Sequence, residues 1–148
     1  MKKITISILS FLFVSLQLQA QNKVEKLTVM GNTYTVTKVF PEEIIGEYTY
    51  EGKGGAPKVL LNDNGTGYFQ PHGVAPVNII FWIDCDENGV WRKQVGATGR
   101  YQYTLVLQYQ DGGTSKNYEK GKYDLMGVMV LKDLGRAVIY GERYKPLK

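Results

Sequence analysis

Apolar and polar residues alternate with a period of two along most of this chain. The clearest segment is RYQYTLVLQYQ, residues 100–110. One set of alternate positions holds Tyr101, Tyr103, Leu105, Leu107 and Tyr109, and the other holds mainly glutamines. Successive side chains of a strand point to opposite faces, so this pattern predicts a half-buried strand. After residue 20 no segment shows a convincing helical stripe.

Turn signals separate the alternating segments. Asn-Gly and Asp-Gly pairs supply the positive backbone angles that tight hairpins need. They occur in NDNGTG (62–67), DENGV (86–90) and QDGG (110–113), and MGNT (30–33) is a similar signal. The predicted strands are 25–30, 33–39, 45–51, 57–62, 66–71, 77–85, 90–95, 100–110, 122–132 and 136–144. The longest polar loop is GGTSKNYEKGK, residues 112–122, which we expect to be the least ordered.

This order of elements predicts an all-β fold. Short strands joined by hairpins form an antiparallel meander, and closure into a barrel removes the unpaired edges of so long a sheet. The segment 25–39 is an extra N-terminal β-hairpin. The chain carries no internal repeat, linker or low-complexity tract, so residues 21–148 form a single predicted domain.

The first twenty residues have the features of a secretory signal peptide. Two lysines precede the apolar run ITISILSFLFVSL (4–16), and Ala20 is a suitable last residue before cleavage. The run is shorter than the about 20 apolar residues that span a bilayer. We therefore expect cleavage after residue 20, no stable membrane span afterwards, and a periplasmic or secreted protein. The alternative is an N-terminal anchor that stays attached.

Charge and cysteine content remove several function classes. The chain has 18 basic and 14 acidic residues, and loss of two lysines with residues 1–20 leaves 16 against 14, or +2. No basic run interleaves with aromatic residues, so nucleic acid is not an expected partner. Cys85 is the only cysteine, which excludes an internal disulfide. It continues the apolar alternation of strand 77–85 and is expected to be buried; the alternatives are an interchain disulfide or a reactive thiol.

Short motifs at the two ends of the domain resemble the lipocalin-like (calycin) pattern. In GEYTYEG, Gly46 and Tyr48 share a face of the first barrel strand, and AVIYGERYKPLK places Arg143 in the last strand. The family opens its barrel with a Gly-x-aromatic pair, usually with tryptophan at the position of Tyr48. The resemblance implies that Arg143 packs over this ring and closes one end. The hairpins LLNDNGTGYF and FWIDCDENGVW are similar to those of small secreted Bacteroidetes domains, many of which have no assigned activity.

The side chains needed for catalysis are scarce. His72 is the only histidine, and Ser115 is the only serine after residue 20, so a nucleophile–base–orienting triad is not expected. One histidine with scattered carboxylates is a poor zinc site, and DCDENG is too short for a helix-loop-helix calcium site. Paired carboxylates drawn from Glu47, Glu51 and Asp84 remain an open alternative for sugar hydrolysis. We expect no catalytic residues, no metal and no cofactor.

Binding is the remaining function class. The chain has 11 tyrosines, and tyrosine and tryptophan combine an apolar body with one polar end, as wet binding surfaces require. His72 lies between Pro71 and Pro76, at a predicted corner, and is expected to be a hydrogen-bonding corner residue or to line the barrel mouth. The candidate ligand-binding residues are Tyr50, Tyr68, His72, Trp82 and Tyr103.

Two functional hypotheses follow from this reading. The first is an exported, non-catalytic carrier or sensor that holds a small, partly apolar or aromatic ligand in an interior cavity. The alternative is an interaction module, an inhibitor or assembly factor, that binds an envelope protein through an exposed aromatic face. Strands 77–85 and 122–132 are apolar on both faces, which predicts either a second packing layer, supplied by the N-terminal hairpin, or an exposed patch.

Overall fold

The computed structural model describes residues 23–52, 57–97, 100–112 and 115–147. The signal peptide predicted for residues 1–20 lies outside them. The strands are β1 (Val24–Val29), β2 (Asn32–Thr37), β3 (Gly46–Tyr50), β4 (Lys58–Leu61), β5 (Thr66–Gln70), β6 (Val77–Asp84), β7 (Lys93–Val95), β8 (Arg100–Tyr109), β9 (Tyr123–Leu131), β10 (Arg136–Ile139) and β11 (Glu142–Leu147). Three short 3-10 turns are η1 (Glu42–Ile44), η2 (Lys116–Tyr118) and η3 (Lys132–Leu134). The described part of the chain contains no helix long and apolar enough to cross a membrane.

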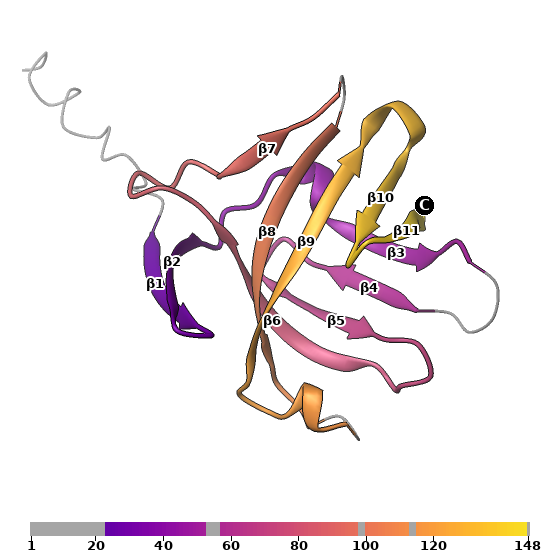
Figure 1. The fold of residues 1–148 in the computed structure, drawn as a ribbon, viewed down its shortest axis with the longest axis horizontal. Coiled ribbons are helices and arrows are strands. Elements are labelled where there is room, and N and C mark those ends of the chain that lie inside the picture. Colours follow the sequence, from indigo (N-terminus) through magenta and orange to yellow (C-terminus); the bar gives the residue numbers. More distant parts are fainter. Residues whose placement is uncertain (1–22, 53–56, 98–99, 113–114, 148) are drawn as a thin grey trace, which may run out of the picture.

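Eight of the strands close into an antiparallel barrel (Figure 1). The ring runs β3-β4-β5-β6-β8-β9-β10-β11, and pairing of β11 with β3 completes it. Strands β1, β2 and β7 lie outside the ring. This confirms the predicted all-β meander, its closure into a barrel and the additional N-terminal hairpin.

One predicted strand is in fact two. The segment 136–144 turns back on itself at Tyr140 and Gly141, which have φ values of 51° and 79°. Ile139 then pairs with Glu142, so only two residues connect β10 and β11. Consecutive positive φ values are typical of the tight hairpin turns whose twist matches that of the flanking strands. Arg143 therefore belongs to a separate last strand, β11.

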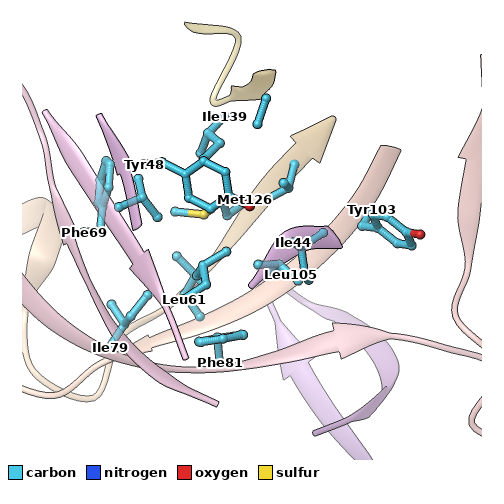
Figure 2. Packing of buried hydrophobic residues seen from close by; sticks show 14 of the residues in the cluster. Ile44, Tyr48, Leu61, Phe69, Ile79, Phe81, Tyr103, Leu105, Met126 and Ile139 are labelled. Carbon is cyan, nitrogen blue, oxygen red and sulfur yellow. The ribbon is translucent and has the colours of Figure 1, made fainter. Parts of the chain in front are cut away.

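The barrel interior is filled by the protein's own side chains. Alternate residues of β6 point inward, and opposing strands contribute aromatic and aliphatic side chains that converge on them (Figure 2). The largest fully buried side chains are Tyr103, Tyr109, Tyr144, Phe81, Ile44, Leu61, Ile79, Ile83, Leu105, Leu107, Met126 and Ile139. Packing of this kind is that of a solid core. The interior cavity expected for a ligand is therefore wrong, because the core side chains fill that space. A ligand site must lie at an end or on the outside of the barrel.

The outer face of β6 is covered by the N-terminal hairpin. Trp82 and Val106 pack with Val29 and Val36 in a second apolar cluster, and Trp82 is only 5% exposed. The prediction that the hairpin supplies a second packing layer is confirmed. The alternative that Trp82 belongs to an exposed aromatic face is wrong, because β2 pairs with β6 and covers the indole.

The two ends of the barrel differ. Turn η1 lies across one end, where Ile44 is fully buried and the Glu43 carboxylate accepts the Tyr103 hydroxyl and lies 3.3 Å from Lys132 Nζ. Antiparallel pairing brings the last residues of β3, β5, β8 and β10 together with the first residues of β4, β6, β9 and β11 at the other end. We call this second end the loop end.

Candidate functional site

The loop end contains a pocket of about 220 Å³ with aromatic walls. Its lining consists of Phe69, Pro71, His72, Tyr118, Asp124, Tyr140, Glu142 and Tyr144. Phe69 and Tyr144 are inward-facing barrel residues, so the floor of the pocket is the top of the core. We call this the aromatic pocket.

The loops around the aromatic pocket are held by specific local contacts. The Asp111 carboxylate accepts the backbone N–H and the side-chain amide of Asn78, at 2.7 and 2.6 Å, which ties the residues directly after β8 to β6. Ser115 Oγ then accepts from the Asn117 N–H and begins η2. This turn directs the Tyr118 ring onto Phe69 and Tyr109, with ring centroids at 6.1 and 5.3 Å. The loop expected to be least ordered thus carries one wall of the pocket.

Asp124 forms the centre of a hydrogen-bond cluster in the pocket. Its Oδ2 accepts the hydroxyls of Tyr109 and Tyr140, at 2.8 and 3.3 Å, and its Oδ1 accepts the Leu125 N–H at 2.8 Å. Burial raises the pKa of Tyr109, and the hydrogen bond to Asp124 raises it further. Burial likewise raises the pKa of Tyr140. Both phenols therefore remain protonated donors, with their hydrogens directed at one carboxylate.

A second carboxylate stands on another wall. His72 Nε2 lies 2.9 Å from Glu142 Oε1, and the Tyr144 hydroxyl lies 3.5 Å from Glu142 Oε2. The rings of His72 and Tyr50 are nearly perpendicular, with their centroids 4.8 Å apart. His72 is thus the hydrogen-bonding corner residue that its proline-rich context predicts, and it also lines the mouth of the barrel.

The five predicted ligand-binding residues divide between several places. His72 lines the aromatic pocket, and Tyr50 packs against it. Tyr68 faces outward and donates to Glu47 at 2.5 Å. Trp82 lies beneath the N-terminal hairpin, and Tyr103 is buried toward the η1 end. The structure therefore brings only Tyr50 and His72 together.

The residues expected to close the barrel are only partly arranged as the resemblance implies. Gly46 has a φ of 146°, which glycine adopts readily, and Tyr48 is a buried core residue. Arg143 does not pack over Tyr48. Tyr144 points inward, so its neighbour Arg143 points outward and is exposed, and the strand partner of Tyr48 is Pro146. The end of the barrel opposite the loop end is closed by turn η1, through the buried Ile44.

Of the eight lining residues only His72 was predicted, and the seven missed include Tyr118, Asp124, Tyr140 and Glu142. Tyr118 is the one aromatic residue of an otherwise polar loop, and Tyr140 precedes a glycine. These two signals were available, since an aromatic residue in a polar loop needs a place to pack. Asp124 and Glu142 carry no such signal, because a carboxylate near a strand end is usually solvated.

The aromatic pocket combines apolar rings with a few polar groups. Its polar groups are two carboxylates, one imidazole and three phenols. Among the described residues no group of three or more histidine, cysteine, aspartate or glutamate side chains is arranged to hold a metal ion. Cys85 is fully buried, as predicted from its alternation, and burial raises the pKa of its thiol.

Comparison of the chain with protein-family models, with curated proteins and with solved structures yields no match. The resemblance to lipocalin-like domains therefore stays a prediction, and the function must be argued from the geometry of the aromatic pocket.

Proposed function

We propose that this protein is an exported, non-catalytic binding protein, a carrier or sensor that takes a small, partly apolar ligand in its aromatic pocket. The observation that carries the proposal is the pocket itself, in which apolar rings and a few oriented polar groups converge at one end of a solid barrel. Sites of this composition are typical of small-molecule recognition. Export rests on the N-terminal sequence.

The size of the pocket limits the ligand. Its 220 Å³ lies below the about 300–1,000 Å³ of pockets that enclose drug-sized molecules. A small ligand, or one end of a larger one, fits this space. Because the interior is filled, the ligand proposed here is held at the loop end and not inside the barrel.

The chain offers a matched pair of variants to test the site. Tyr140 and Met30 both have left-handed backbone angles, with φ of 51° and 49°, and each precedes a glycine in a two-residue hairpin turn. Asparagine tolerates this conformation. Tyr140→Asn removes a wall of the pocket, whereas Met30→Asn makes the same change in the distant β1–β2 turn, at a side chain that is 72% exposed.

The experiment is native mass spectrometry of the mature protein from its own host, under native and denaturing conditions. The expected result is extra mass that disappears on denaturation, that Met30→Asn retains and that Tyr140→Asn loses. Bare protein from the host, together with no thermal stabilisation by a panel of small amines, sugars and aromatic acids, would overturn the proposal. Equal retention by both variants would place the ligand elsewhere and overturn it as well.

A second candidate function is the envelope interaction module. The observation that favours it is β7, which ends the sheet and whose residues are all exposed. Val95 is 69% exposed there, and Val90 nearby is 62% exposed. Exposed apolar residues beside a free strand edge are typical of strand addition by a partner. Capture of one envelope protein that is lost in Val95→Lys and kept in Leu134→Lys, a control on the exposed η3 turn, would favour this function.

A further inference from the structure

We propose that the aromatic pocket recognises a small organic cation, a quaternary or protonated amine. This inference rests on the proposed function and adds the chemical class of the ligand. It follows from the sign of the charges that line the pocket, from the direction of its hydrogen bonds and from its aromatic walls.

The pocket has the opposite charge to the chain. Without residues 1–20 the chain has 16 basic and 14 acidic residues, a net charge of +2, yet the charged residues of the described lining are Asp124 and Glu142, with no lysine or arginine among them. His72 is the remaining titratable base and lies against Glu142. An acidic recess on a protein of slightly positive net charge attracts a cationic ligand and repels an anion.

The hydrogen bonds within the pocket also favour a cationic ligand. The Tyr109 and Tyr140 hydroxyls both donate to Asp124, and the Tyr144 hydroxyl lies within reach of Glu142. These donors are thus directed at the protein's own carboxylates. A carboxylate has about four acceptor positions in all, so acceptor capacity remains while phenol donors are occupied. A ligand that brings positive charge and donors is therefore favoured over one that brings acceptors.

The walls supply the second element of cation recognition. Four aromatic side chains line the pocket, and Phe69 contacts two of the others: its ring centroid lies 5.2 Å from that of Tyr140 and 6.1 Å from that of Tyr118. Aromatic faces attract quaternary and protonated amines, and clustered rings around such a group are a recurring device. Together with the carboxylates they provide a site for a compact ammonium group.

The test uses two probes of the same shape. Choline is compared with its neutral carbon isostere, in which a tert-butyl group replaces the trimethylammonium group, by calorimetry and by amide NMR shifts of the mature protein at low salt. Choline is expected to bind about tenfold or more tightly than the isostere, to shift the amides of Leu125 and Gly141, and to bind more weakly as salt increases.

Three charge-removing variants refine the test, two in the pocket and one control outside it. Glu142→Gln is expected to weaken choline binding severalfold while leaving the fold intact, because the Glu142 side chain is 37% exposed. Glu119→Gln, an exposed position of the neighbouring loop outside the lining, makes the same change in charge and is expected to leave binding unaltered. Asp124→Asn is a second pocket variant in which the carboxylate's charge is lost and its shape retained.

Other outcomes separate this inference from the proposed function. Equal binding of the neutral isostere, or preferential binding of a neutral sugar, would overturn the cationic ligand and leave a binding pocket in place. Absence of choline binding at millimolar concentration would also overturn it. The proposed function itself fails only if the protein from its host is bare and the broader panel does not stabilise it.

Discussion

His72 Nε2 lies 2.9 Å from Glu142 Oε1, although 70 residues separate the two positions in the chain. The pair joins the connection after β5 to the first residue of β11. It thus links two of the loops that meet at the loop end and defines one wall of the aromatic pocket.

This pair is expected to matter for the shape of the pocket more than for stability. Both side chains are exposed in part, 47% for His72 and 37% for Glu142, and ion pairs in that setting contribute about 0–1 kcal/mol. His72→Ala should therefore lower the free energy of unfolding by less than about 1 kcal/mol in urea denaturation. A loss several times larger would mean that the corner at Pro71 depends on the imidazole.

The buried tyrosine that donates to the pocket residue Asp124 should behave differently. Tyr109 is fully buried, and its hydroxyl is the closer of the two phenols that donate to Asp124. Tyr109→Phe leaves this carboxylate short of a donor, which costs about 1–3 kcal/mol. Urea denaturation measures the loss. Tyr140→Phe removes the longer bond, at 3.3 Å, of a residue that is 39% exposed, and should cost less. The reverse order would contradict this account of the cluster.

Removal of the N-terminal hairpin should expose Trp82. In a Trp91→Phe background, a chain that begins at Lys38 lacks β1 and β2 but retains every strand of the closed ring. We expect tryptophan emission to shift to longer wavelength, because an indole that is 5% exposed then meets water. Unfolding should remain cooperative. The control is the same truncation with Trp82→Phe and Trp91 retained, and unchanged emission in the first variant would refute the covering role of the hairpin.

The free energy of unfolding should fall at high pH, because Tyr48 is buried with a raised pKa. Burial raises the pKa of Tyr48 from 10.0 to about 12. Between these values the unfolded phenol ionises while the folded phenol does not, so the stabilisation is complete below about pH 10 and is lost as pH rises through about 12. Urea midpoints measured from about pH 9 to about pH 12 should fall, and less steeply in Tyr48→Phe. Identical slopes in the two proteins would contradict the prediction.

Cys85 should be protected in the folded protein. Its side chain is fully buried, and burial raises the pKa of the thiol, so little thiolate is available to react. A chromogenic disulfide reagent should modify Cys85 many times more slowly in buffer than in urea. Rapid labelling in buffer, or a disulfide-linked dimer from the host, would show that the thiol is accessible.

The alternation of apolar and polar residues was sufficient to predict the fold class. Strand 77–85 is an example, because Val77, Ile79, Phe81 and Ile83 follow a period of two that only an extended chain places on one face. Turn pairs such as Asn-Gly added the antiparallel connections. The break at Tyr140-Gly141 was missed, because a tyrosine in the left-handed conformation is uncommon and the flanking residues continue the alternation.

The candidate site depended on the tertiary structure. The sequence by itself determined an all-β meander, a lone buried thiol at Cys85 and a corner at His72, since local period, turn chemistry and composition act over a few residues. Only closure of the ring decided which face of each strand points inward. The same closure brought Tyr118, Asp124 and Glu142 together. Closure joins residues far apart in the chain at one end of the barrel, and no local pattern encodes that encounter.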